Sequence, residues 1–250
     1  MIENLRFPQL GRSKRPRTTQ GERVYAIGDV HGRYDLLATL IDRLWDDTQT
    51  RAKARGRIVV LGDFIDRGPQ SRAVVTLLKS IDQFDGVTVL LGNHEALLLD
   101  CLMGDLDACR AWLRMGGDAT LASYGVAPPA EGEDGHDFAC RLGAAIGEPV
   151  IDWLRERPLT ARSGDYFFCH AGVRPGVALD RQAPADLLWI RQEFLASTRA
   201  HGAIVVHGHS PGEHVEICSN RIAVDTGAYR SGLLSAVGLE GSEVWAVTSA

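Results

Sequence analysis

Short apolar runs alternate with amphipathic stretches along the first hundred residues. The runs VYAI (24–27), IVVL (58–61) and VTVLL (87–91) predict strands, because they are short and rich in β-branched residues. Between them, Leu, Ile and Val recur at helical spacing in 36–44 and 74–81. Strands that alternate with helices in this way predict crossover connections and a largely parallel inner sheet.

The pattern changes to helices in the middle of the chain and then returns to strands. Stretches such as EALLLDCLM and VIDWLRER predict a helical insert at about 96–160, which an acidic, exposed loop at 127–137 interrupts. YFFC (166–169) and AIVV (203–206) predict strands, and hairpin-like pieces such as RIAVD and EVWAVT follow. The whole pattern predicts an α/β fold with two packed mixed sheets flanked by helices.

Composition narrows the class of protein. A chain of 250 residues with 45% apolar and 24% charged residues fits a single domain, which we place at 21–250. The net charge of −5 gives no general basic field, so we expect neither nucleic acid nor an anionic membrane as a partner. No apolar run approaches the roughly 20 residues that span a bilayer, and the N-terminus has no apolar signal segment.

Residues 1–20 form a basic N-terminal stretch that includes Arg12, Lys14, Arg15 and Arg17. Two interpretations stay open for it: a flexible, solvated tail, or an arm that binds phosphate or a partner.

The chain has five cysteines and no Cys-x-x-Cys pair. An odd number without such a pair favours reduced thiols over a disulfide framework or a thiolate zinc site. We therefore expect a cytoplasmic protein.

Five polar clusters each follow a predicted strand directly. Loops beyond the carboxyl ends of strands are where open α/β sheets bind ligands. The Asp, His and Asn side chains in them suit Mn, Fe, Zn or Mg. The clusters are GDVHG (28–32), GDFIDRG (62–68), GNHE (92–95), HAG (170–172) and HGHSP (207–211).

Their residues can form a two-metal site. Asp29 and His31 are one residue apart, so on an extended segment they project to the same side and can share one cation. Asp63 has two carboxylate oxygens with which to bridge two ions. Two ions roughly 3.5–4 Å apart can clamp the attacking and leaving oxygens of a phosphate ester. Three further side chains would complete the second ion: Asn93, His170 and His209.

Each cluster alone also has a structural interpretation. Asp66 could cap the following helix, Glu95 could favour a helix N-terminus, and His170 could be a core histidine. Five clusters in this order, each at a strand end, favour the metal site.

Together the motifs resemble the GDxHG, GDxxDRG, GNHE and HAG signatures of the phosphoprotein phosphatase family, and of its compact bacterial and bacteriophage branch above all. The resemblance covers about residues 24–240 and implies the calcineurin-like metallophosphoesterase fold. It implies the metal ligands named above, with two divalent ions, Mn²⁺ first and Fe, Zn or Mg as alternatives. The Gly-His pattern before a small hydroxyl residue and Pro favours His209 over His207 as the ligand.

The same resemblance implies the remaining roles. His94 would be the general acid, and Asp66 would orient it and sustain its imidazolium form. Arg67 and Arg191 would bind the phosphate. Tyr229 would lie beside the site, with a plain packing role as the alternative.

The function that the resemblance implies first is a serine/threonine protein phosphatase that uses a hydroxide bridging two metal ions. The alternatives are a symmetrical dinucleoside tetraphosphatase and a broad small-molecule phosphatase or phosphodiesterase. A non-catalytic metal-binding scaffold is a more remote alternative. The substrate is thus a phosphorylated protein or a small phosphoester. Base-stacking aromatics in the insert would favour the tetraphosphatase, but Trp112, Tyr124 and Trp153 equally suit a core.

Overall fold

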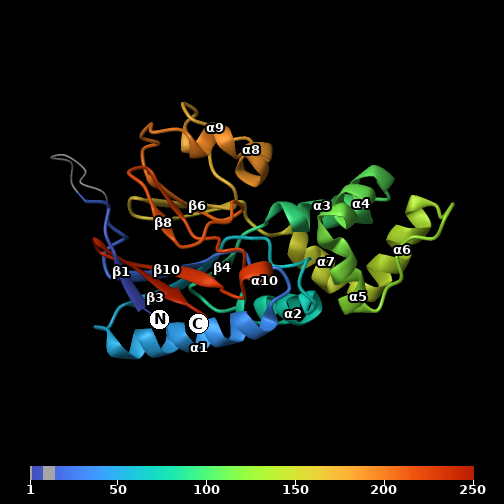
Figure 1. The fold of residues 1–250 in the computed structure, drawn as a ribbon, viewed down its shortest axis with the longest axis horizontal. Coiled ribbons are helices and arrows are strands. Elements are labelled where there is room, and N and C mark those ends of the chain that lie inside the picture. Colours follow the sequence, from blue (N-terminus) through green and yellow to red (C-terminus); the bar gives the residue numbers. More distant parts are fainter. Residues whose placement is uncertain (1, 8–14) are drawn as a thin grey trace.

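Two β-sheets pack face to face, with helices outside both and a helical insert at one side (Figure 1). The computed structural model describes residues 2–7 and 15–250. The first sheet runs β1 (Ile2–Leu5), β11 (Glu243–Thr248), β10 (Ser235–Glu240), β2 (Glu22–Ile27), β3 (Arg55–Val60), β4 (Val87–Val89). The second runs β5 (Thr160–Ser163), β6 (Tyr166–Cys169), β7 (Ile204–His207), β9 (Arg221–Ala223), β8 (Glu216–Ile217).

Ten α-helices occur in the described part of the chain, together with a π-helical segment, Leu113–Gly117, and a short 3₁₀ turn, Leu179–Arg181. The α-helices are α1 (Tyr34–Thr50), α2 (Ser71–Ile81), α3 (Asn93–Leu102), α4 (Leu106–Trp112), α5 (Asp118–Tyr124), α6 (Gly135–Ile146), α7 (Glu148–Arg155), α8 (Pro184–Trp189), α9 (Gln192–Leu195) and α10 (Ala228–Ser231).

The strands β2, β3 and β4 are parallel neighbours, as the alternating pattern predicts. The helices α1 and α2 are their crossover connections, so the carboxyl ends of all three strands meet at one edge of the sheet. β10 pairs antiparallel with β2 and extends this parallel unit into a mixed sheet. The second sheet is also mixed, which confirms the predicted fold class.

Alternation along the strands divides the core between the two faces of the first sheet. Val24 and Ala26 face the second sheet, where they pack in one cluster with Phe168. Tyr25 and Ile27 face the helices and belong to the larger cluster under α1 and α2. A third cluster lies beneath α8 and α9, on the outer face of the second sheet.

The helical insert, α3 to α7, contains the one disulfide of the described residues. Cys101 on α3 and Cys109 on α4 are bonded, with Cα atoms 4.5 Å apart. The expectation that all cysteines are reduced was therefore wrong for this pair. The tight turn between the two helices returns the chain and brings the thiols together, which spacing alone did not indicate. Three cysteines are free: Cys140, Cys169 and Cys218.

The N-terminal stretch is not simply a flexible tail. Residues Ile2–Leu5 form the edge strand β1, which pairs antiparallel with β11. Thr18 is buried, and its hydroxyl donates to the carbonyl of Glu22. Main-chain hydrogen bonds to a sheet edge supplied the order that composition could not predict. Arg12 and Lys14, on which the arm interpretation depended, lie outside the described residues.

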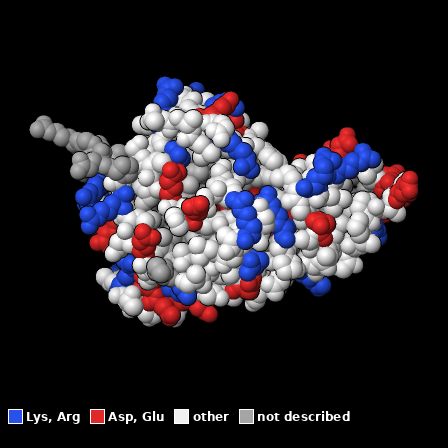
Figure 2. Space-filling view, in the orientation of Figure 1, with Lys and Arg blue, Asp and Glu red and all other residues white. Residues whose placement is uncertain are grey.

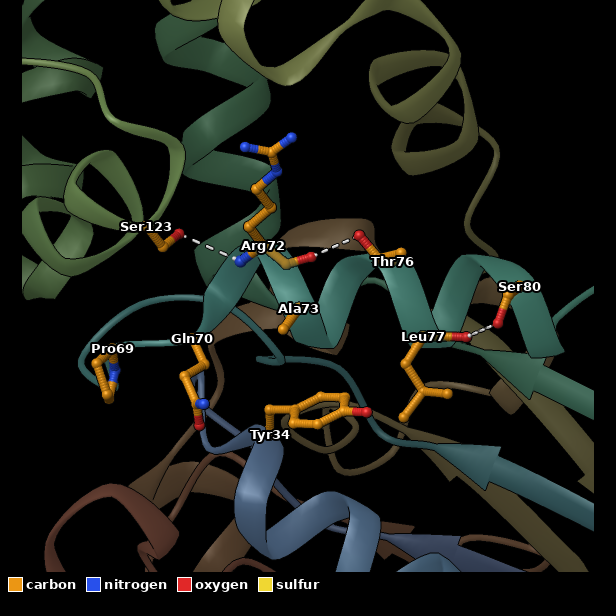
Figure 3. A pocket seen from close by; sticks show the side chains of 9 residues that line it. All are labelled: Tyr34, Pro69, Gln70, Arg72, Ala73, Thr76, Leu77, Ser80 and Ser123. Carbon is orange, nitrogen blue, oxygen red and sulfur yellow. Dashed lines mark hydrogen bonds between the residues drawn. The ribbon is translucent and has the colours of Figure 1, made fainter.

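No helix within residues 2–7 and 15–250 is both long and apolar enough to cross a bilayer. A pocket of about 590 Å³ lies between α1 and α2 (Figure 3). Tyr34, Gln70 and Ser123 are among its lining residues, and Arg72 is the one charged side chain there. This pocket therefore offers no carboxylate or imidazole for catalysis.

Candidate metal centre

The five polar clusters meet between the two sheets. Three of them follow the parallel strands β2, β3 and β4 of the first sheet, and two follow β6 and β7 of the second. Main-chain hydrogen bonds join the loops. The amides of Val30 and His31 both donate to the carbonyl of Asp63, at 3.1 and 2.9 Å, and Gly208 donates to His170 at 2.8 Å. The carboxyl ends of strands from both sheets thus build a single site, as predicted.

Backbone strain is concentrated in this site. Five non-glycine residues of the described chain have positive φ, between 44° and 70°, and all five were predicted as site residues. Each such conformation costs on the order of 1–3 kcal/mol. Strain of this kind persists where the surrounding packing holds side chains in a functional position. The residues are His31, Asp63, Asp66, Arg67 and His209.

Asp63 joins two groups of potential ligands. In the first group, its Oδ2 lies 3.8 Å from Nε2 of both His31 and His94. In the second, its Oδ1 lies 3.3 Å from Nε2 of His170, and His209 completes the group. Burial by itself raises the pKa of Asp63, but the neighbouring imidazoles outweigh it and hold that pKa well below its ordinary value. Asp63 is therefore an ionised carboxylate shared by both groups.

The histidine rings are oriented by main-chain carbonyls. Nδ1 of His31 lies 2.9 Å from the carbonyl of Ile65, and Nδ1 of His170 lies 2.8 Å from that of Leu61. A neutral ring that donates from Nδ1 turns the lone pair of Nε2 toward the site, as metal-binding histidines do. Burial lowers the pKa of His31 to about 3.

Asn93 and His209 complete the second group. Nε2 of His170 lies 2.9 Å from Oδ1 of Asn93 and 3.1 Å from Nδ1 of His209. Burial is the main cause that lowers the pKa of His209 to about 2, with His170 the next. Asn93 Nδ2 and His209 Nε2 are buried and have no hydrogen-bond partner among the residues that the structure describes.

Asp29, predicted as a ligand of the first ion, contacts the backbone of His209 in this structure. Both of its carboxylate oxygens accept the backbone N–H of His209, at 3.1 and 3.0 Å, and it belongs to neither ligand group. The third member of the first group, beside His31 and Asp63, is His94. Burial raises the pKa of Asp29 well above its ordinary value, and the nearby carboxylates of Asp225 and Asp63 raise it further. Asp29 thus lies at the centre while its oxygens link the two sheets.

His207 and His209 have separate environments. The ring of His207 packs edge-on against Phe194, 5.0 Å away, within the region under α9. Burial lowers its pKa to about 4. His209 is grouped with Asp63 and His170, and His207 belongs to neither ligand group.

His94 and Asp66 form a buried pair. Nδ1 of His94 lies 2.6 Å from Oδ2 of Asp66. Trp112 and Thr120, both from the helical insert, donate to the same carboxylate at 2.8 and 2.6 Å. Burial lowers the pKa of His94, but Asp63 and Asp66 outweigh it, so that pKa lies above the ordinary value.

Glu95 is the residue of the centre whose role sequence reasoning missed. Its buried carboxylate accepts the main-chain N–H groups of Asp63, Phe64, Ile65 and Gly92, at 2.9 to 3.1 Å. Burial raises its pKa to about 7. The fourth letter of GNHE was the available signal, because an acid at the third position of a helix can reach back to preceding amides.

Arg67 lies directly over the first ligand group. Its two terminal nitrogens are each 3.0 Å from an imidazole Nε2, one of His31 and one of His94. The guanidinium carbon lies 4.7 Å from the ring centre of Tyr229, whose ring also contacts His31. Its backbone N–H donates to the carbonyl of Gly116, at the π-helical segment. Tyr229 therefore lies beside the site and supports Arg67.

Arg191 is exposed at the start of α9, and its charge helps to lower the pKa of His209 after burial and His170. Lys and Arg side chains gather in the middle of one face, between the region of α8 and α9 and the helical insert (Figure 2). Trp189, on α8, also lies beside the centre, with its ring 6.4 Å from that of His209.

The donor set fits divalent cations. The imidazole nitrogens and carboxylate oxygens of each group lie within 4.8 Å of one another, and the residues that carry them are buried. Nitrogen and oxygen donors of this kind suit Mn, Fe or Zn. Acceptor atoms that face one another, such as His170 Nε2 and His209 Nδ1 at 3.1 Å, would be stabilised by a cation between them.

Comparison with known proteins agrees with this geometry. A symmetrical bis(5'-nucleosyl)-tetraphosphatase of Dechloromonas aromatica is 34% identical over 151 residues, 60% of this chain and 44% of that protein. One of the same name from Vibrio cholerae is 28% identical over 165 residues, 65% of this chain and 50% of that protein. The chain thus spans about half the length of these curated relatives.

Solved structures share the fold. One provisionally named a diadenosine tetraphosphatase has a TM-score of 0.65 at 22% identity, and covers 93% of this chain and 98% of its own. A protein serine/threonine phosphatase of Saccharomyces cerevisiae has a TM-score of 0.56 at 16% identity, and covers 94% and 84%. The calcineurin-like phosphoesterase family model matches residues 22–233. The chain is therefore a metallophosphoesterase and belongs to the calcineurin-like phosphoesterase family.

Proposed function

We propose that this metallophosphoesterase hydrolyses dinucleoside tetraphosphates symmetrically, so that diadenosine tetraphosphate and water give two molecules of ADP. The observation that carries the proposal is the shared name of the relatives from Dechloromonas and Vibrio, combined with the two-group centre of this chain. The motif resemblance placed a protein phosphatase first. The likeness to the yeast phosphatase, at 16% identity, supports the fold alone.

In this proposal, two divalent ions are held around the shared Asp63. His31 would hold one ion, with Asp29 as its second protein ligand once it turns from the His209 amide. Asn93, His170 and His209 would hold the other. Such ions lower the pKa of water toward about 7 and neutralise phosphoryl oxygens. Mn²⁺ is the first candidate, with Fe, Zn and Mg as alternatives.

Arg67 and His94 act together on the phosphate chain. In the structure Arg67 donates to Nε2 of His94, so that nitrogen carries no proton while the contact lasts. A phosphoryl oxygen gives Arg67 another acceptor and frees Nε2 to hold a proton, which Asp66 stabilises from the other side of the ring. Arg191 at the start of α9 would take further phosphate charge.

The test compares substrates side by side with Mn²⁺: diadenosine tetraphosphate, a phosphothreonine peptide and p-nitrophenyl phosphate. We expect diadenosine tetraphosphate to have the highest kcat/KM and ADP to be the only nucleotide product. In ¹⁸O water, one of the two ADP molecules carries the label. ATP plus AMP as products, or faster turnover of the peptide, would overturn the proposal.

A further inference from the structure

Trp189 is an exposed aromatic side chain at the edge of the candidate centre. It is 41% exposed, and its ring plane is 85° to that of His209. Its neighbours Leu187, Leu188 and Ile190 are all at most 8% exposed. The backbone therefore directs three aliphatic side chains into the core and leaves the large indole beside the site.

The other four tryptophans have different environments. Trp112, Trp153 and Trp245 are at most 6% exposed and belong to the core. The insert thus offers no exposed tryptophan on which a base could stack. Such a residue was the feature of the insert that would have favoured a tetraphosphatase. Trp45 is 66% exposed, but it lies on α1, which covers the outer face of the first sheet. Trp189 is the tryptophan that is both exposed and next to the centre.

The position of Trp189 is fixed relative to the centre. The amide of Ala171, next to His170, donates to the carbonyl of Leu187 at 2.8 Å. Arg174 binds Asp186 on α8 at 2.6 and 2.9 Å and Glu193 on α9 at 2.7 Å, so it ties α8, which ends at Trp189, to α9. A platform held in this way loses little freedom when a ligand stacks on it.

Charge at the same edge suits a nucleotide. Arg191, two residues after Trp189, is exposed at the start of α9. A nucleoside diphosphate group has an aromatic base at one end and phosphate charge at the other. Trp189 presents an aromatic face beside His209 of the centre, and Arg191 adds a cation two residues along the chain. We infer that Trp189 is the surface on which one base of a dinucleoside polyphosphate stacks.

This inference rests on the proposed function, so its test separates the two. Diadenosine tetraphosphate is compared with inorganic tetraphosphate, which has the same phosphate chain without bases. Replacing a stacking aromatic residue with alanine typically weakens binding of the base roughly tenfold. The substrate ratio is the kcat/KM for diadenosine tetraphosphate divided by that for inorganic tetraphosphate. We expect Trp189→Ala to lower this ratio about tenfold and Trp189→Phe to restore most of it. Trp45→Ala, the matched exposed tryptophan, should leave the ratio within about twofold.

Product inhibition gives a second readout. The inhibition constant of ADP should rise about tenfold in Trp189→Ala, while that of inorganic pyrophosphate should not. A general loosening of α8 would change both constants alike and would overturn the inference. An unchanged substrate ratio in Trp189→Ala, with the wild type active on diadenosine tetraphosphate, would also overturn it and leave the proposed function intact. A wild type that does not cleave diadenosine tetraphosphate would instead overturn the proposed function and this inference with it.

Discussion

Asp66 accepts a hydrogen bond from Nδ1 of His94 at 2.6 Å, and two donors from the helical insert hold that carboxylate in place. Once Arg67 releases Nε2 of His94, the pair would stabilise a protonated imidazole whose Nε2 lies 3.8 Å from the shared Asp63. An acid held in this way matters most for a leaving group that needs a proton.

We therefore expect His94→Asn to act differently on two monoesters. Glycerol phosphate leaves as an alkoxide, and its kcat should fall by about 10²–10⁴. p-Nitrophenyl phosphate leaves as a stable phenolate, and its kcat should fall much less. Steady-state kinetics on both substrates checks this, with Asp66→Asn expected to follow the same pattern more weakly. An equal loss on both monoesters would contradict the role of an acid.

Arg67 should contribute mainly to phosphate binding. Hydrogen bonds to charged groups contribute about 1.5–3 kcal/mol, so Arg67→Ala should raise KM about 10- to 100-fold for every phosphate substrate. Arg72→Ala is the matched control, because Arg72 lies on α2 at the pocket of Figure 3, outside the centre. An Arg67→Ala variant with normal KM and low kcat would instead assign this residue to the chemical step.

Metal removal should distinguish His209 from His207. Adding Mn²⁺ at about a hundred times its Kd to chelator-treated protein should raise Tm by roughly 5–10 °C. His207→Ala creates a cavity beside Phe194 and lowers Tm, but the increase caused by Mn²⁺ should remain. His209→Ala should lose much of that increase. Thermal unfolding with and without metal checks this, and equal increases in both variants would exclude His209 as a ligand.

Glu95 should be a structural determinant of the centre. Glu95→Ala leaves four buried N–H groups without their acceptor, so it should lower the free energy of unfolding by about 3 kcal/mol or more. Glu148→Ala, on the exposed side of α7, should change it by no more than about 0.5 kcal/mol. Urea denaturation of metal-free protein measures both. A loss for Glu95→Ala as small as that of the control would contradict this role.

His201 should make stability depend on pH. Burial and the charges of Arg199 and Arg221 lower its pKa, and its Nε2 lies 3.3 Å from the amide nitrogen of Asn220. The unfolded chain takes up a proton near pH 6.5, whereas the folded chain does so only at lower pH. The free energy of unfolding therefore falls as the pH drops below about 6.5.

His201→Gln keeps an acceptor for Asn220 but removes the titration. Urea denaturation should show a smaller decrease of stability between about pH 7 and 5 in this variant than in the wild type. The two proteins should have parallel profiles above pH 7.5. An identical slope throughout would show that His201 is not the group responsible.

The sequence by itself determined the fold class and the site's location. Alternating runs predicted β2, β3 and β4 as parallel neighbours, and the clusters at their ends carried Asp63, His31 and Asn93 to one edge. These are local signals, because strand periodicity and the loop that follows a strand are properties of adjacent residues. Choosing between protein phosphatase and tetraphosphatase was beyond those signals, since both share the same metal motifs.

Tertiary structure decided what adjacent residues could not. The Asp29 carboxylate turns to the amide of His209, 180 residues away, and Trp112 reaches Asp66 from the insert. The Cys101–Cys109 bond and the β1 edge strand likewise depend on where separate segments return. The exposure of Trp189 belongs to the same class, because burial of the three residues around it depends on how α8 packs on the second sheet. Contacts of this kind arise from the packing of distant elements and leave no periodic trace in the chain.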